Sequence, residues 1–393
     1  TGQAATDGGQ PTTVSDQPPV IQDNPGLMEP FELLVRTINR PKYNEFDPTV
    51  VLFLTFPVFF GFMIGDFGYG ALYTAMGYYM YTSFDSDAIR SLGGIALWAG
   101  GFTMLFGLLY GEVFGLHQLG DIVWGGHPPL HKGLAPHFIA YAKLWLSLSL
   151  IAGLVHMTVG YAFDFLKNLS HSFRDALTES GSWIILMLGL WVWVFSHSAE
   201  AFKPTFIYEV FNGQPIPLGF AGFSPTVGIA AIAVALLIGL PLLVIGEGGI
   251  GLLESLNVLV NVLSYTRLAA VLLAKAGMAF VVNLLVFGVY VTGHGEEQSW
   301  HFGLSHMPEV GATAHGHEVA DIMFGGLVHS GIAGIAVGAL ILLVGHLLVL
   351  VLGITSAGLQ AVRLEYVEFF GKFFEGGGKP YAPFGTERTY TSD

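Results

Sequence analysis

The chain has 393 residues, of which 52% are hydrophobic and only 11% are charged, and its formal net charge is −14. Soluble domains average about 25% charged residues, so this composition excludes a water-soluble globule and indicates a polytopic membrane protein. The acidic balance argues against a nucleic-acid partner, and the absence of cysteine excludes disulfides and thiolate metal sites within this sequence.

The first residues, TGQAATDGGQPTTVSDQPPVIQDN from Thr1 to Asn24, are rich in Gly, Pro, Gln, Thr and Asp. Such a composition is typical of a flexible linker. We expect residues 1–28 to be a linker from an N-terminal cytoplasmic domain that lies outside this sequence. Residues 29–393 are then a membrane domain with eight helices and a short cytoplasmic C-terminal tail.

Apolar segments predict about eight transmembrane helices in an all-α fold. The first two are short and meet at Gly65-Asp66-Phe67-Gly68-Tyr69-Gly70, so we expect them to be tilted or paired as a hairpin. The last two exceed a simple span, which predicts strong tilting or breaks, with Gly345, Gly353 and Gly358 as candidate break points. The segments are 49–64, 67–82, 92–115, 138–164, 180–198, 225–245, 249–291 and 323–370.

The distribution of basic residues predicts the orientation. With the N-terminus inside, more Lys and Arg flank the inner ends than the outer loops, which favours cytoplasmic N- and C-termini in a multi-pass protein of the cell membrane. The inner set is Arg36, Arg40, Lys42, Arg90, Lys167, Arg174, Lys372, Lys379 and Arg388, and the outer set is Lys132, Lys143 and Lys203.

Arg267 lies inside an apolar segment, NVLVNVLSYTRLAAVLLAKAGMAF. An arginine at the centre of a membrane helix costs about 2.5–3.5 kcal/mol and cannot escape by losing its proton. It therefore needs a carboxylate, a carbonyl group or water. A structural arginine locked to an acid is the alternative, but a charge at this depth indicates an ion pathway.

Polar residues follow one face of the same segment. At 100° per residue, five of them fall within an arc of about 80°, and Arg267 lies about 60° beyond its edge. This stripe indicates either an aqueous path or hydrogen bonding between helices, and the pattern alone does not separate the two. Its members are Glu254, Asn257, Asn261, Ser264 and Lys275.

Arg363 repeats the pattern in GITSAGLQAVRLEYVEFFGKFF. Ser356, Gln360 and Arg363 share a face about 60° wide, although Arg363 could also reach the membrane interface with its long side chain. A fixed arginine can hold a nearby carboxyl group in its ionised form. If a partner carries a protonated carboxyl group past it, the proton leaves there, and two partial water channels would give one-way exchange.

These residues resemble a known family, subunit a (subunit I) of the V-type and archaeal A-type ATPases, from Pro30 onward. The motifs that carry the resemblance are PFELLVRTINRPKYNEFDPT, FPVFFGFMIGDFGYG, GLVHMTVGY, LSYTRLAAVLLA and VRLEYVEFFGKFFEGGGKPYAPF. The archaeal form is the more similar, through Ser264-Tyr265-Thr266-Arg267 and the compact loops.

The resemblance implies a stator membrane subunit of a rotary ATPase or ATP synthase, beside a ring of proteolipid c subunits in the lipid bilayer. It implies peripheral-stalk and central-stalk partners, no cofactor and no catalytic centre of its own, and the chain has no GxxxxGK[ST] loop. Arg267 and Arg363 would face the ring carboxylates, with Gln360 beside the second arginine. Glu254 and Glu368 would lie on the cytoplasmic side, and Lys275, Ser356 and His346 on the outer side.

Two departures from the family pattern concern the outer path: Gly353 stands where some relatives have an acid, and Lys275 where some have His. The residues alone also leave two other classes open. One is a stand-alone secondary transporter whose intramembrane arginine binds an anionic substrate, and the other is a metalloenzyme that uses the His-rich stretch from His294 to Asp321. We expect that stretch to be a solvated loop, and the core position of His156 to be hydrogen-bonded. Asp66 and Glu112, at outer helix ends, could line an ion exit or form structural pairs.

Overall fold

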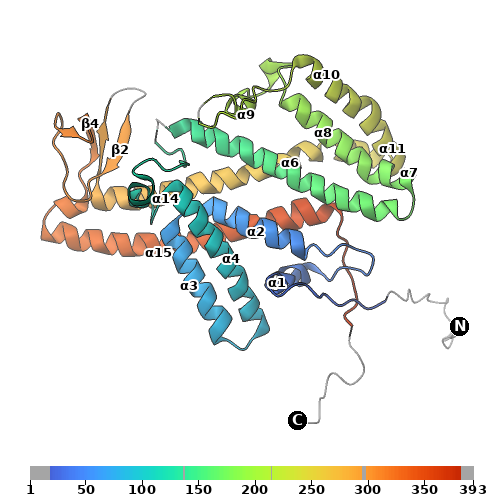
Figure 1. The fold of residues 1–393 in the computed structure, drawn as a ribbon, viewed down its shortest axis with the longest axis horizontal. Coiled ribbons are helices and arrows are strands. Elements are labelled where there is room, and N and C mark those ends of the chain that lie inside the picture. The colour runs from blue at the N-terminus through green and yellow to red at the C-terminus, as the bar shows by residue number, and fades with distance from the viewer. Residues whose placement is uncertain (1–17, 136–137, 214, 294–297, 382–393) are drawn as a thin grey trace, which may run out of the picture.

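The computed structural model describes residues 18–135, 138–213, 215–293 and 298–381, which are mostly helical (Figure 1). The elements are α1 (Glu29–Ile38), α2 (Thr49–Ile64), α3 (Phe67–Ser83), α4 (Asp87–Tyr110), α5 (Gln118–Trp124), α6 (Ile139–Leu169), α7 (Phe173–Asp175), η2 (Ala176–Gly181), α8 (Ser182–Val194), α9 (Phe206–Glu209), α10 (Pro225–Val234), η4 (Ala235–Gly239), α11 (Leu240–Glu247), α12 (Gly249–Glu254), α13 (Asn257–Leu263), η5 (Ser264–Thr266), α14 (Arg267–Phe287), β1 (Val289–Thr292), β2 (Ser299–Phe302), β3 (Thr313–Ala314), β4 (His317–Phe324), α15 (Ile332–Arg363) and η8 (Leu364–Phe369).

Six helical segments of the described chain are long and apolar enough to cross a membrane. They confirm the predicted polytopic helical class, whereas a count of eight stays a prediction because α2 and α3 have only 16 and 17 residues. The tilt of the last two segments relative to the bilayer also stays a prediction. The six are Asp87–Tyr110, Ile139–Leu169, Phe173–Val194, Pro225–Glu247, Gly249–Phe287 and Ile332–Lys372.

The long helices α6 and α15 lie along the long axis of the molecule with α2 and α14 packed between them, and α3 and α4 project from it together as a hairpin (Figure 1). Of the two arrangements predicted for α2 and α3, the hairpin is wrong because α3 packs along α4 instead, and the tilt stays a prediction. Glycines make this contact close: a Cβ at Gly77 would lie 2.7 Å from the Leu97 nitrogen, and one at Gly93 would lie 2.5 Å from the Tyr81 nitrogen. Small residues let membrane helices approach in this way.

Gly65 and Asp66 form the turn between α2 and α3. Gly65 ends α2 with a φ of 47°, a left-handed conformation that glycine adopts without strain. Asp66 then caps α3, since its carboxylate accepts the Tyr69 N–H at 3.1 Å. The same carboxylate also accepts the N–H groups of Phe114 and Gly115 at 2.9 and 2.7 Å, which gives Asp66 a structural role.

The last two apolar segments are not broken at the predicted glycines. Helix α15 runs unbroken from Ile332 to Arg363 past all three candidate glycines. Gly345 and Gly353 instead provide room for α14, because a Cβ there would lie 2.8 Å from Val282 and 2.5 Å from Lys275. The segment before it is interrupted by a turn between α12 and α13 and by the 3₁₀ turn η5, immediately before Arg267.

A four-stranded antiparallel sheet, in the order β2-β1-β4-β3, closes one end of α14 and α15 (Figure 1). The predicted plain loop is therefore wrong for the described residues of this region. The fully buried run Val289–Thr292 forms the inner strand β1, and its β-branched and aromatic residues favour a strand. We call this end of the molecule the sheet end.

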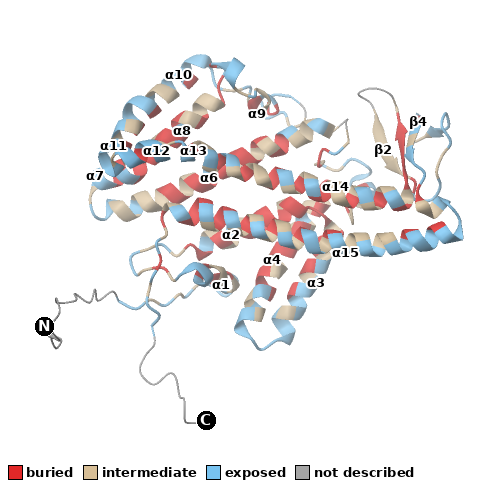
Figure 2. Cartoon of the chain, turned by 180° about the vertical axis from the view of Figure 1, so that it is seen from behind, coloured by how far each residue is buried: buried red, intermediate tan, exposed pale blue. Residues whose placement is uncertain are grey.

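The opposite end carries the C-terminal residues and is called the tail end below. There Val20 pairs with Pro380, and Asn24 donates a hydrogen bond to Glu32 at 2.9 Å. Residues 1–17 of the predicted linker lie outside the described residues, so the linker and its domain boundary stay a prediction. In Figure 2 the buried residues concentrate where α2, α6 and α14 meet, whereas much of α15 is exposed.

Candidate functional site

Arg267 begins α14 directly after the 3₁₀ turn η5, and its side chain is 25% exposed. One guanidinium nitrogen donates to the Ser264 hydroxyl at 3.2 Å. The other, Nη1, lies 3.8 Å from a carboxylate oxygen of Glu368 in η8. Nη1 is buried and has no hydrogen-bond partner among the described residues, so the arginine keeps donor capacity for a further acceptor.

Arg363, the last residue of α15, is exposed and close enough to Arg267 for their charges to repel. One turn earlier, the side-chain oxygen of Gln360 is buried without a hydrogen-bond partner in the described chain. Ser356 contacts the Gly353 carbonyl at 3.5 Å. The predicted face of α15 thus brings Gln360 and Arg363 together, while Ser356 bonds only to its own helix.

A cavity of about 680 Å³ opens at the tail end. The first three residues of the predicted polar stripe, Glu254, Asn257 and Asn261, line it together. Other helices add acids that sequence reasoning missed, and two lysines accompany them. These added residues are Asp164, Lys167, Glu179, Glu247, Lys372 and Glu375.

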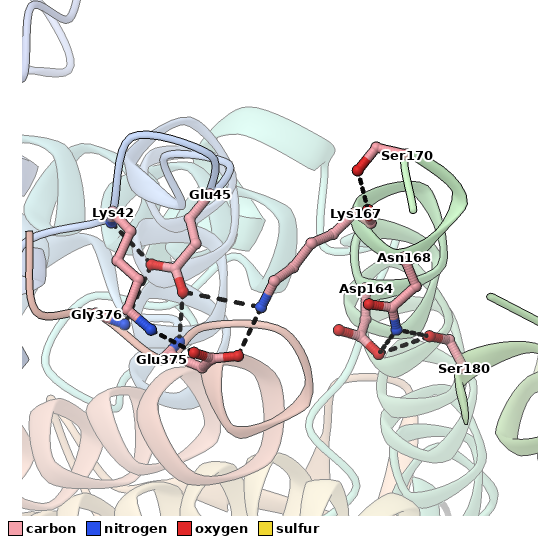
Figure 3. Close-up of polar contacts among 9 residues, drawn as sticks. All are labelled: Lys42, Glu45, Asp164, Lys167, Asn168, Ser170, Ser180, Glu375 and Gly376. Atoms are coloured by element: carbon pink, nitrogen blue, oxygen red, sulfur yellow. Dashed lines mark hydrogen bonds and ion pairs between the residues drawn. The ribbon is translucent and has the colours of Figure 1, made fainter. Parts of the chain in front are cut away.

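Helix α6 supplies one polar rim of this tail-end cavity (Figure 3). Asp164 accepts a hydrogen bond from Ser180 at 2.6 Å, and Asn168 donates to the same hydroxyl at 3.0 Å. On the other side, Lys167 donates to Glu375 at 2.8 Å. Asp164 and Asn168, four residues apart on α6, therefore hold the η2 side chain, and Lys167 holds the tail side chain.

Glu375 fixes the tail beside the cavity (Figure 3). It is bound by Lys167 and by Lys42, while Glu45 accepts the backbone N–H groups of Glu375 and Gly376 at 3.0 and 3.1 Å. The hydrogen bonds from Lys167 and Lys42 lower the pKa of Glu375 from 4.5 to about 2. The carboxylate is therefore ionised at any physiological pH.

Lys275 lies two turns beyond Arg267 toward the sheet end and is 2% exposed. Its ammonium group donates to the Val349 carbonyl of α15 at 2.7 Å and lies 3.9 Å from the centre of the Tyr69 ring. No carboxylate of the described chain lies within 4.0 Å of this nitrogen. A buried ammonium held by a carbonyl and a ring face is unusual for a purely structural group.

A hydrogen-bonded chain continues from Tyr69 toward the sheet end. The Tyr69 hydroxyl donates to Nδ1 of His346 at 2.6 Å, and Nε2 of His346 donates to the Asn283 side-chain oxygen at 3.1 Å. The Asn283 nitrogen then donates to the Phe114 carbonyl at 2.8 Å. One neutral tautomer of His346 satisfies every contact. Sequence reasoning placed His346 on this side but missed Tyr69 and Asn283.

A second buried cluster supports the turn before Arg267. Nδ1 of His156 bonds the Tyr265 hydroxyl at 2.8 Å, and Nε2 lies 3.5 Å from Glu365, which accepts a hydrogen bond from Thr55 at 2.6 Å. The expectation that His156 is a hydrogen-bonded core residue is confirmed. Because Tyr265 belongs to η5, this cluster fixes the backbone that presents Arg267.

Two other predicted sites, Glu112 and the His-rich stretch, lie toward the sheet end. Glu112 forms a buried ion pair with Lys132 at 2.6 Å, which is a structural pairing. Among the residues that the structure describes, no group of three or more His, Cys, Asp or Glu residues could hold a metal ion. His294, the first residue of the candidate metal-binding stretch, lies outside the described residues.

The family model described as the V-type ATPase 116kDa subunit family matches residues 3–118. The A-type ATP synthase subunit I of Halobacterium salinarum is 53% identical over 412 residues, an alignment that covers 99% of this chain and 55% of that protein. The A-type ATP synthase subunit I of Archaeoglobus fulgidus is 31% identical over 406 residues, covering 92% of this chain and 52% of that protein.

A eukaryotic relative matches a smaller part. The vacuolar proton translocating ATPase 100 kDa subunit of Dictyostelium discoideum is 27% identical over 176 residues, which cover 36% of this chain and 21% of that protein. The chain spans about half the length of the archaeal relatives. The family resemblance is thereby confirmed, and the chain belongs to the family of subunit a and subunit I of the V-type and A-type ATPases.

Proposed function

We propose that this chain is the ion-translocating membrane part of a rotary ATPase or ATP synthase stator. It would present Arg267 and Arg363 to carboxylates of a rotating c-ring and so couple ion flow to rotation. The observation that carries the proposal is the position of Arg267 between two polar routes: the tail-end cavity reaches Asn261, and the hydrogen-bonded chain at the sheet end begins near Lys275.

The electrostatics of Arg267 support this role. Its Nη1 has donor capacity left unused, and Glu368 at 3.8 Å only partly compensates its charge. A guanidinium group in a low-dielectric region lowers the pKa of a carboxyl group that approaches it. A ring carboxyl group would therefore release its proton near Arg267 and would need to be protonated again before it moved into lipid.

The surface around Arg363 supports a partner or lipid on this face. Helix α15 exposes large apolar side chains along its central part and up to one turn before Arg363. These residues are Leu340, Leu343, Leu347, Leu348, Val351, Leu352 and Leu359. A charged residue at the end of such an apolar face suits a ring of apolar helices that carry carboxyl groups. We assign the ring of c subunits to this face and lipid to the remaining exposed apolar surface.

In this proposal the tail end is cytoplasmic, and so are both termini, in agreement with the positive-inside prediction. Residues 1–28 connect to an N-terminal cytoplasmic domain that contacts the stalk subunits, and residues 29–393 form the membrane domain. ATP binding and hydrolysis belong to other subunits. The ring carboxylates bring the ion, so the chain needs no cofactor.

Cysteine accessibility tests the two routes, because an introduced cysteine is the sole thiol in this chain. In the assembled complex in sealed vesicles, we expect a cysteine at Asn257 to react with a membrane-impermeant thiol reagent only from the cytoplasmic side. A cysteine at Ser299 of β2, which lines a cavity at the sheet end, should react only from the outer side. Reaction of both from one side would contradict the proposal.

A further inference from the structure

The turn η8 carries two acids, Glu365 and Glu368, whose surroundings differ. Glu368 lies 3.8 Å from Nη1 of Arg267. Glu365 instead contacts Thr55 of α2 and His156 of α6. Since η8 is a π-turn, whose hydrogen bonds join residues five apart, residues three apart point to more distinct sides than they do in an α-helix. The two carboxyl groups can therefore be in different charge states.

Glu365 is completely buried, with no exposed surface. No Lys or Arg nitrogen of the described chain lies within 4.0 Å of its carboxyl oxygens, and the one basic group at that distance is His156. An ionised carboxylate in the protein interior is costly unless a cation compensates it. The charge state of Glu365 therefore depends on whether His156 is a cation.

The hydrogen bonds of His156 indicate a neutral ring. Its Nδ1 lies 2.8 Å from the hydroxyl of Tyr265, which is fully buried and has no other hydrogen-bond partner among the described residues. The hydroxyl proton therefore needs Nδ1 as its acceptor. An imidazolium ring carries a proton on both nitrogens and accepts none, so it would leave the hydroxyl proton buried without a partner. A neutral His156 supplies no cation for Glu365.

The contacts of Thr55 indicate a proton on Glu365. The Thr55 hydroxyl lies 2.7 Å from the Val51 carbonyl and 2.6 Å from Oε1 of Glu365. The hydroxyl has a single proton, and a carbonyl oxygen or an ionised carboxylate can only accept. An ionised Glu365 would thus compete with Val51 for that proton. A protonated Oε1 donates to Thr55, Thr55 donates to Val51, and both short contacts are hydrogen bonds.

One neutral arrangement then satisfies the whole cluster. Tyr265 donates to His156, Nε2 of His156 points its proton at Oε2 of Glu365, and Oε1 donates through Thr55 to Val51. The step between Nε2 and Oε2 is long at 3.5 Å. Both atoms are buried without another hydrogen-bond partner in the part of the chain that the structure describes, so each is the acceptor or donor that the other lacks.

We propose that Glu365 is a positioning residue that stays protonated during ion translocation and holds η8 and η5 beside Arg267 without adding a charge. The inference rests on the proposed function. Tyr265 lies two residues before Arg267 in the chain, and Glu368 follows Glu365 in the same turn. With Glu365 neutral, Glu368 is the one carboxylate of the described chain that lies near Arg267. A second anion beside Arg267 would weaken its attraction for a ring carboxylate.

The charge state is tested by the infrared difference spectrum of the native complex minus the complex with Glu365→Gln, with the full-length subunit at neutral pH. The ring carboxyl groups are present in both complexes and cancel. We expect the variant to lose the carbonyl stretch of a protonated carboxylic acid and to keep all carboxylate stretches. Glu209→Gln, at an exposed position, is the control and should lose carboxylate stretches, because an exposed glutamate is ionised at neutral pH. Loss of carboxylate stretches in Glu365→Gln would overturn the proposal.

The positioning role is tested by ATP-driven proton uptake in vesicles. Glu365→Gln keeps a neutral donor and an acceptor at the same place, so it should assemble and pump at the native rate. Glu365→Leu removes both groups and should pump about tenfold more slowly, because small displacements of a positioned group cost up to about 10²-fold in rate. If Glu365→Leu does not assemble, Thr55→Val removes the partner of Oε1 and should slow pumping in the same direction.

Two outcomes contradict the positioning role. One is failure of Glu365→Gln to assemble or to pump, since an uncharged side chain of the same shape should then suffice. The other is native pumping by Glu365→Leu or, in its place, by Thr55→Val. Continued proton uptake by Arg267→Ala would instead overturn the proposed function, and it would leave the infrared result for Glu365 unchanged.

Discussion

The ammonium group of Lys275 occupies the space that a side chain at Gly353 would need. A Cβ at position 353 would lie 2.5 Å from Nζ of Lys275 and 2.9 Å from the Tyr73 hydroxyl. The two positions, on α14 and α15, are therefore mutually dependent. Gly353 and Lys275 thus form one arrangement, in which a buried lysine fills the place that the glycine leaves.

This relationship predicts that Gly353→Ala destabilises the complex. Forcing a methyl group into a filled site costs about 1–3 kcal/mol, and the displaced ammonium loses its bond to Val349. The measurement is the thermal unfolding midpoint of the assembled complex. Gly101→Ala is the matched control in another membrane helix, because a Cβ there meets nothing within 4 Å.

The same relationship predicts coupling between the two sites. With Lys275→Ala in place, Gly353→Ala should cost less than it does alone, because the nearest atoms that it strikes are gone and only the Tyr73 hydroxyl at 2.9 Å remains. A double-mutant cycle measures the difference, and contacting residues typically couple by about 0.5–3 kcal/mol. Simple additivity of the two costs would show that Lys275 does not occupy the space at Gly353.

Tyr265→Phe tests the buried cluster of His156, Tyr265 and Glu365 beside Arg267. The change removes the hydroxyl that bonds His156 at 2.8 Å, and an unsatisfied buried group costs about 1–3 kcal/mol. We expect a lower unfolding midpoint and slower proton pumping, because η5 loses an anchor directly beside the arginine. Tyr78→Phe, at an exposed position of α3, should change neither quantity. A native unfolding midpoint and native proton pumping in Tyr265→Phe would show that the His156–Tyr265 bond does not support Arg267.

The ion pairs of Glu375 with Lys42 and Lys167 predict that the attachment of the C-terminal tail depends on pH. Because the folded pKa of Glu375 is depressed to about 2 from 4.5, its contribution is fully present above pH 4.5 and is lost as the pH falls toward 2. Its side chain is 61% exposed, so the contribution is small and screened by salt. Limited proteolysis of the tail against pH should show protection fading within this window.

The variant Glu375→Gln tests whether the ionised carboxylate of Glu375 holds the C-terminal tail in place. It should leave the tail accessible to protease at pH 7, as acid does for the native chain, since Lys42 and Lys167 lose their anionic partner. Glu309→Gln, an exposed acid near the sheet, is the control and should leave the tail protected. If the tail of Glu375→Gln stays protected, the backbone contacts to Glu45 hold it without the ion pairs.

Site residues could be predicted from the sequence where they follow helical spacing within one helical segment. Glu254, Asn257 and Asn261 were assigned to one face by helical spacing, and they line one cavity. Arg267 and Arg363 were identified by the cost of burying a charge, and they lie close enough to interact. The helix breaks were misplaced because glycine permits both breaks and close contacts, and only the neighbouring helix decides which occurs.

Residues contributed by other helices were not predictable from spacing. Asp164 and Glu247 join the tail-end cavity only because α6 and α11 pack beside α12 and α13. Likewise, the pairing of His156 with Glu365 joins positions more than two hundred residues apart. The strand Val289–Thr292 did carry a local signal in its β-branched residues, but it directly follows an apolar helix and was merged with it.

The most direct test of the central claim is ATP-driven proton uptake into vesicles that contain the complete complex, with native subunit, Arg267→Ala or Arg174→Ala. Arg174 is an exposed arginine at the start of α7, so its variant should pump like the native complex. We expect the complex with Arg267→Ala to assemble fully and to hydrolyse ATP but to accumulate no protons. Proton accumulation at the native rate by assembled Arg267→Ala would contradict it.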